Sequence, residues 1–355
     1  MDRAPLPREL TRPVHVGSVQ IGGRAPVAVQ SMTCTPTTDA DATLAQVRAL
    51  AEAGCDLVRV SVPTKDAVEP FGRVCAESPV PIIADIHFDH RLAIAAVRAG
   101  AAKLRINPGN IGSWEKVDAV IDAAGEAGVA IRIGVNAGSL QKDLAERQDL
   151  TQAEKLCASA ERFVKHFEDR GFTDIVLSAK AHSVTTTLDT YRTLSRELPQ
   201  IPLHLGVTEA GGVRQGTIKS SIALGALLAE GIGDTMRVSL TADPLEEVPV
   251  AWGILQAVGV RRRGPEMVSC PTCARCKVDM IPIAQEVERR LSTCRKPLSV
   301  AVMGCAVNGP GEASDADVGV ACGKDSALLF RHGQVVRKIP ASEIVDDLMA
   351  EIDRL

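Results

Sequence analysis

A short β-branched segment, a turn and a longer segment of helical period recur eight times between residues 27 and 260. The longer segments are rich in Ala, Leu and Glu, and those at 41–54 and 153–171 end at a glycine, which favours a left-handed helix C-cap. Eight such units match a closed parallel barrel. We therefore predict an α/β chain with an N-terminal (β/α)8 TIM barrel. An open doubly wound sheet is the alternative, because βαβ order alone does not prove closure.

Polar side chains interrupt seven of the predicted strands, which begin near residues 56, 81, 102, 130, 174, 201 and 234. Helix-covered parallel strands normally read as apolar runs, so these residues need a reason. Side chains alternate faces with period two, so each strand directs its polar residues to one face, mostly in its C-terminal half. Barrels of this kind place their active sites there. The predicted mouth residues are Arg59, Ser61, Asp85, His87, Arg105, Asn107, Arg132, Asn136, Ser178, Lys180, His182, His204, Thr208, Arg237 and Ser239.

Cations dominate this predicted mouth. Brought together without anions, they would raise the local potential by several kT and would need a strongly anionic ligand. Guanidinium groups match phosphate oxygens bidentately, so a phosphate or diphosphate ester is the natural candidate. Structural ion pairing is the alternative, but few carboxylates occupy matching positions, namely Asp85 and Glu209. The cations are Arg59, Arg105, Arg132, Lys180 and Arg237.

Clustered cysteines mark the last part of the chain. Cys270, Cys273 and Cys276 follow one another at two-residue gaps, and Cys305 stands beside glycines. Thiolates grouped in this way hold a metal, and a C-x-x-C-x-x-C run favours an iron–sulfur cluster. Structural zinc and buried, unligated thiols are the alternatives. Residues 258–266 resemble a linker to a small α/β module, so we predict domains at 1–262 and 263–355.

The overall charge and hydropathy exclude two kinds of partner. With 40 Lys and Arg against 44 Asp and Glu, the net charge of −4 provides no broad electrostatic footprint for nucleic acid. The longest nearly uncharged apolar run, 248–260, is too short to span a bilayer. Ten cysteines without an export signal indicate a reducing compartment. We therefore expect a cytoplasmic protein that binds neither nucleic acid nor membrane.

Nine segments, taken together, resemble the family of bacterial 4-hydroxy-3-methylbut-2-enyl diphosphate synthases, also called IspG or GcpE. They are VQSMTCTPTTD, VRVSVP, ADIHFDHRLA, LRINPGNIG, IRIGVNAGSL, LSAKAHSV, LHLGVTEAG, CPTC and GCAVNGPGE. The resemblance implies a TIM barrel followed by an iron–sulfur domain. It also implies reductive ring opening and dehydration of 2-C-methyl-D-erythritol 2,4-cyclodiphosphate to (E)-4-hydroxy-3-methylbut-2-enyl diphosphate, in the non-mevalonate isoprenoid pathway.

The same resemblance implies a 4Fe-4S cluster held by Cys270, Cys273, Cys305 and Glu312. Oxygen is a poorer partner for this iron than thiolate, so Glu312 is expected to be the exchangeable and catalytic ligand. Family members often lack a cysteine at position 276, although the spacing alone would have selected Cys276 as a ligand.

Further roles follow from this resemblance. Glu209 is the candidate proton donor, and Asn308 would bind the substrate together with the mouth residues. Flavodoxin or ferredoxin would supply electrons. The family also works as homodimers in which the barrel of one subunit meets the cluster domain of the other. The alternative function is a barrel that acts on another phosphate ester by acid–base chemistry, with a structural zinc in the C-terminal domain.

Overall fold

The computed structural model describes residues 6–305, 311 and 313–355. Over these ranges the chain divides into two compact units, Met1–Arg261 and Arg262–Leu355. No helix in the described part of the chain is both long enough and apolar enough to cross a bilayer.

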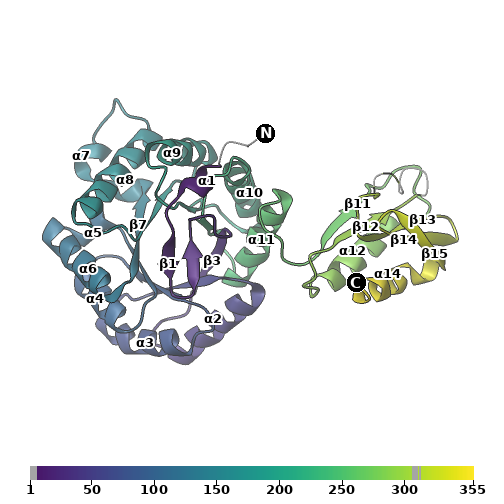
Figure 1. Ribbon diagram of the computed structural model, residues 1–355, viewed down its shortest axis with the longest axis horizontal. Helices are drawn as coiled ribbons and strands as arrows, with labels where there is room; N and C mark the ends of the chain where they lie inside the picture. The colour runs from purple at the N-terminus through teal and green to yellow at the C-terminus, as the bar shows by residue number, and fades with distance from the viewer. Residues whose placement is uncertain (1–5, 306–310, 312) are drawn as a thin grey trace. The chain divides into compact units, whose positions relative to one another are not determined.

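The described residues of the first unit form an eight-stranded parallel sheet in the order β8-β7-β6-β5-β4-β3-β10-β9 (Figure 1). The sheet closes because the Leu177 N–H donates to Pro202 O at 2.8 Å and Leu177 bridges Leu203. The barrel prediction is therefore confirmed over the open sheet. The strands are β3 (Ala28–Met32), β4 (Leu57–Ser61), β5 (Ile82–Ile86), β6 (Lys103–Ile106), β7 (Ala130–Asn136), β8 (Ile175–Lys180), β9 (His204–Leu205) and β10 (Thr235–Met236).

A long helix follows each barrel strand, and the helices form a ring around the sheet in Figure 1. Local signals set their ends. The Asp39 side chain accepts from the Ala42 N–H at 3.0 Å, and Gly54 ends the same helix with φ of 118°. The long helices are α2 (Ala40–Ala53), α3 (Val68–Glu77), α4 (His90–Arg98), α6 (Trp114–Ala127), α8 (Gln152–Asp169), α9 (Val184–Glu197), α10 (Val213–Ala229) and α11 (Glu247–Ala257); short helices are α1 (Pro7–Leu10), α5 (Pro108–Ile111) and α7 (Lys142–Ala145).

An antiparallel hairpin, β1 (Val14–Val16) and β2 (Val19–Ile21), covers the N-terminal end of the barrel. Its inner side chains Val14, Val16 and Ile21 are fully buried. They pack against an apolar layer at the beginning of the strands, formed by Ala28, Leu57, Ile83, Ala130 and Val176. The hairpin and this layer therefore fill the N-terminal end of the barrel with side chains.

The described part of the second unit contains a five-stranded sheet in the order β11-β12-β13-β14-β15. The first three strands are parallel, and the last two are antiparallel. Side chains of α12 and α14 build one core with this sheet. The elements are β11 (Glu266–Ser269), α12 (Met280–Leu291), β12 (Ser299–Met303), β13 (Val318–Cys322), β14 (Ser326–Arg331), β15 (Gln334–Pro340) and α14 (Ile344–Asp353). The predicted small α/β module is confirmed.

Truncating the hairpin core should destabilise the barrel. We expect Ile21→Ala to lower the free energy of unfolding by about 2–5 kcal/mol, because it leaves a cavity between the hairpin and the apolar layer. Both tryptophans, Trp114 and Trp252, lie in the first unit, so tryptophan fluorescence during urea unfolding reports on the barrel. The control Ile218→Ala, at a 53% exposed position, should change the value by no more than about 0.5 kcal/mol. Equal losses in both variants would contradict a structural role for the hairpin.

Candidate active site

A cavity of about 240 Å³ opens at the C-terminal ends of the barrel strands. Side chains from successive strands, or from the residues directly after them, line it. Strand parity therefore brings together most of the side chains predicted for the mouth. The lining residues are Met32, Arg59, Asp85, His87, Arg105, Arg132, Asn136, Ser178, Lys180, Thr208, Arg237 and Ser239.

Other predicted residues lie elsewhere. Asn107 is buried, donates to Ser139 Oγ at 2.7 Å and accepts from the Gly109 N–H, so its amide caps α5 and does not line the cavity. His204 is fully buried in the barrel. His182 and Glu209 are exposed beyond the strand ends. Asn308 and Glu312 lie outside the described residues.

Asp85 supplies negative charge to the lining of the cavity. Its Oδ1 lies 3.3 Å from Arg105 Nη1, and its Oδ2 lies 3.9 Å from Arg59 Nε and 3.8 Å from His87 Nε2. Burial pushes the pKa of Asp85 upward, but Arg59 and Arg105 outweigh burial and hold the pKa below its ordinary value. Asp85 is therefore a carboxylate near neutral pH, and it is shared between several cations.

A second carboxylate, which sequence reasoning missed, belongs to Glu247 in the first turn of α11. Its side chain is 3% exposed and accepts two hydrogen bonds from Arg237, from Nε and Nη2, each at 3.0 Å. Ser31 Oγ also donates to it at 2.8 Å. Strand parity does not reveal it, because Glu247 lies in a helix. An acidic residue in the helix that follows the Arg237 strand was the signal available.

Further cations have no matching carboxylate among the described residues. Arg132 is 1% exposed, and its Nε and Nη1 have no hydrogen-bond partner there. Burial, with Arg59 and Arg105 adding to it, lowers the pKa of Arg132 well below its usual value. Burial also lowers the pKa of Lys180, with Arg132 as the next cause.

Lys103 is a buried cation that sequence reasoning also missed. It lies two residues before Arg105 on β6, is fully buried, and its Nζ has no partner among the described residues. Burial first, and then Arg132, lowers its pKa well below its usual value. Period-two alternation would have placed Lys103 on the inner face with Arg105.

Two glycines make room for the cations. A Cβ at Gly206 would lie 2.5 Å from Lys180 Nζ, and one at Gly134 would lie 2.7 Å from Arg105 Nε. Real Cβ atoms essentially never approach that closely. A side chain at either position would force a long basic side chain of the neighbouring strand to shift, which glycine in the LHLGV and IRIGV segments avoids.

The second unit presents cysteines around Gly304, the residue that follows β12. The Gly304 N–H donates to Cys270 Sγ at 3.0 Å. Cys270 is half-buried, Cys273 is exposed and Cys305 is buried. Thiol sulfurs beside a side-chain-free residue and a peptide donor suit a thiolate-bound iron–sulfur cluster. Within 6–305, 311 and 313–355, however, no three Cys, His, Asp or Glu side chains are grouped closely enough to hold a metal ion.

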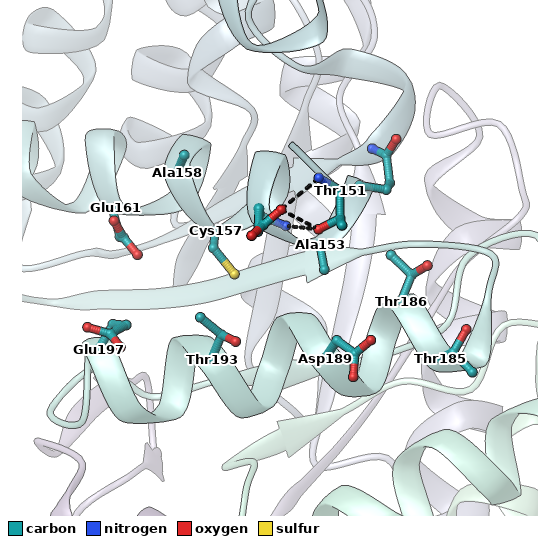
Figure 2. Close-up of a pocket in the computed structure, with 12 residues that line it drawn as sticks. Thr151, Ala153, Cys157, Ala158, Glu161, Thr185, Thr186, Asp189, Thr193 and Glu197 are labelled. Carbon is teal, nitrogen blue, oxygen red and sulfur yellow. Dashed lines mark hydrogen bonds between the residues drawn. The ribbon is translucent and has the colours of Figure 1, made fainter. Parts of the chain in front are cut away.

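Another cavity, of about 490 Å³, lies between α8 and α9 on the outside of the barrel. Figure 2 shows the side chains of one helix facing those of the other, with Glu161 opposite Glu197. Its charged residues are acidic, namely Glu154, Glu161, Asp189 and Glu197. Burial, and then Glu197, raises the pKa of Glu161. The acidic lining of this groove would repel an anionic ligand.

Two family models match the chain. One, described as the GcpE TIM-barrel domain, covers residues 11–252, and the other, the GcpE protein C-terminal domain, covers residues 266–354. The chain belongs to the GcpE family. Proteins named 4-hydroxy-3-methylbut-2-en-1-yl diphosphate synthase (flavodoxin) from Clostridium acetobutylicum and Geobacter sulfurreducens are each 51% identical to this GcpE chain over 345 residues. These matches cover 97% of the chain and 99% and 98% of those proteins.

The barrel also resembles a solved structure outside the family. Dihydropteroate synthase from Burkholderia cenocepacia aligns with a TM-score of 0.52 and 16% identity, covering 70% of this GcpE chain and 98% of that chain. At this level of identity the likeness concerns the fold alone.

The excess of buried cations predicts that a diphosphate will stabilise the barrel. We expect inorganic pyrophosphate to raise the Tm followed by tryptophan fluorescence, because a ligand at ~100 times its Kd stabilises the folded state by about 2.7 kcal/mol. Arg132→Met should remove most of this shift. The matched control Arg192→Met, which removes an exposed arginine paired with Glu230, should retain it at the same ionic strength. A shift of equal size in both variants would place the pyrophosphate elsewhere.

Proposed function

We propose that this protein catalyses the reductive ring opening and dehydration of 2-C-methyl-D-erythritol 2,4-cyclodiphosphate to (E)-4-hydroxy-3-methylbut-2-enyl diphosphate, an oxidoreductase step of the non-mevalonate isoprenoid pathway. The observation that carries the proposal is the barrel mouth, where buried cations outnumber the described carboxylates. The names of the relatives support the same reaction. Nothing comparable supports an acid–base enzyme with a structural zinc.

The cations would bind the diphosphate and stabilise the charge that the reaction creates. Opening the ring breaks a carbon–oxygen bond and leaves an additional negative charge on a phosphate oxygen. Arg132 has guanidinium nitrogens without partners among the described residues, and Lys180 lies in the same cavity. Preorganised donors of this kind stabilise developing charge without reorganisation. Asn136, Thr208 and Ser239 would add neutral contacts from the cavity wall.

None of Asn107, His182 and His204 lines the cavity, so each would have a role other than direct contact in this cavity. Asn107 would position the loop after β6 through its cap on α5. His204 would pack inside the barrel beneath the cations. His182 would reach the substrate only from outside the described cavity. Asn308 is kept as a predicted substrate contact.

We further propose that Cys270, Cys273, Cys305 and Glu312 hold a 4Fe-4S cluster. When bound, the cluster would supply the two electrons, one at a time. The Cys270 thiol, which accepts from the Gly304 N–H, supports the place of Cys270 in this donor set. Glu312 remains a prediction on both counts, as ligand and as catalytic residue.

The proposed function also involves an electron donor, a role for each domain and a subunit arrangement. The relatives are named for flavodoxin, so flavodoxin is the proposed electron donor, with ferredoxin as the alternative. Residues 1–262 would bind the substrate and 263–355 the cluster. As in the sequence-based prediction, two subunits would form a homodimer in the cytoplasm, with the barrel of one facing the cluster domain of the other.

Glu209 is the proposed proton donor for the departing hydroxyl. It follows β9, is exposed, and has a φ of 53°, a conformation that is uncommon for a residue other than glycine. We expect Glu209→Gln to lower kcat by about 10²–10⁴-fold, the usual contribution of a general acid, with little change in substrate Kd or in the absorption of the cluster. Steady-state kinetics and substrate titration would measure these effects. The control Glu246→Gln changes an exposed carboxylate on the next loop, and an equal fall in kcat there would refute the assignment.

Iron and sulfide analysis tests the ligand set. Chains purified without oxygen should contain four irons and four sulfides each, as a 4Fe-4S cluster requires. Cys276→Ser should retain both, while Cys270→Ser should lose most of them because a cluster ligand is removed. Loss of iron from Cys276→Ser would replace Glu312 by Cys276 in the ligand set, and stoichiometric zinc would favour the acid–base enzyme.

A further inference from the structure

Cys276 lies close to a proposed cluster ligand although the proposed function gives it no role. A Cβ built on Gly304 would lie 2.6 Å from Cys276 Sγ and 3.3 Å from Cys270 Sγ. The two sulfurs therefore adjoin the same point and can be no farther apart than the sum of these distances. No side chain separates them, because the residue between them is glycine.

The two cysteines pack against opposite faces of the sheet. Cys270 packs with Ala301 and Met303, whereas Cys276 packs with the core that contains Val300 and Val302. Residues of alternate parity on β12 point to opposite faces. The two cysteines, held on opposite faces, both reach Gly304, the residue that follows the end of β12. The Gly304 C=O also accepts from the Lys277 N–H at 3.0 Å, which holds the Cys276 loop against this residue.

We propose that Cys270 and Cys276 form a reversible disulfide when the cluster is absent, which keeps Cys270 from irreversible oxidation. The oxidant is a small disulfide such as oxidised glutathione. One protein thiolate attacks it and releases one reduced glutathione, and the second protein thiolate then displaces the other glutathione. Two thiols and one oxidised glutathione thus give one protein disulfide and two reduced glutathiones. A thiol reductant returns both cysteines.

Neighbouring thiols are less suited to this pairing. Cys322 is fully buried at the end of β13, which keeps the oxidant away and disfavours the thiolate that either step needs. Cys273 is the rival, because C-x-x-C pairs are common redox motifs. The Cys273 side chain is exposed, whereas the Cys276 sulfur lies beside Gly304, where the Cys270 sulfur also lies. The inference depends on these positions and not on the reaction, so its failure would leave the proposed function intact.

Disulfide mapping of the full chain tests the proposal. The chain, freed of cluster by chelation, is treated with oxidised glutathione, alkylated and digested with trypsin, which separates Cys276 in 276–277 from Cys270 and Cys273 in 264–275. We expect these two peptides to be linked in most of the oxidised chains, and the linkage to disappear with dithiothreitol. The cluster-loaded chain should not form it.

Serine variants identify the partner. The linkage should persist in Cys273→Ser and be lost in Cys270→Ser, and Cys276→Ser should carry glutathione on 264–275 instead. As a matched control, Cys294→Ser changes a half-buried cysteine of the same unit and should behave as the parent chain. A disulfide within 264–275 in the parent chain, or a linkage that survives in Cys270→Ser, would overturn the proposal.

Discussion

Like charges held together inside the barrel are the constraint on which the site depends. Asp85 and Glu247 each neutralise arginines, but Arg132, Lys180 and Lys103 have no carboxylate of their own among the described residues. Burying such groups costs free energy, and pKa values lowered by burial are the sign of that cost. Among the described residues the barrel mouth therefore favours an added anion, whose binding would reduce the repulsion.

Apolar packing at one end of the barrel and glycines between its strands accommodate this arrangement. The β1–β2 hairpin and the first layer of strand residues pack together at the N-terminal end. Gly134 and Gly206 let Arg105 and Lys180 lie across neighbouring strands. Fold and site therefore constrain each other. The glycines weaken strands that the surrounding helices must stabilise. The same glycines leave room for the cations to converge on one cavity.

Periodicity predicted most of the fold and much of the site. The eight βα units gave the barrel, and period-two alternation gave the lining from Arg59 to Ser239. Alternation indicates a face but not how far along the barrel a side chain reaches, so Asn107 and His182 were grouped with the mouth although neither lines it. Glu247 could not be found by strand parity because a helix supplies it. Lys103 follows the parity rule, because it lies two residues before Arg105 on the same strand.

For a related reason, cysteine spacing could not predict which thiols lie side by side. A C-x-x-C-x-x-C run states how far apart thiols are along the chain, but not from which side of a sheet each one arrives. Cys270 and Cys276 come to Gly304 from opposite faces of β12, which no count of intervening residues reveals. The same closeness admits two chemistries, because a thiol beside a cluster ligand can compete for the metal or bond to the ligand when the metal is gone. Since Gly304 places no side chain between the two sulfurs, the second chemistry would be open to Cys276 once the metal is gone, while the first would make Cys276 a competitor of the proposed ligand Glu312.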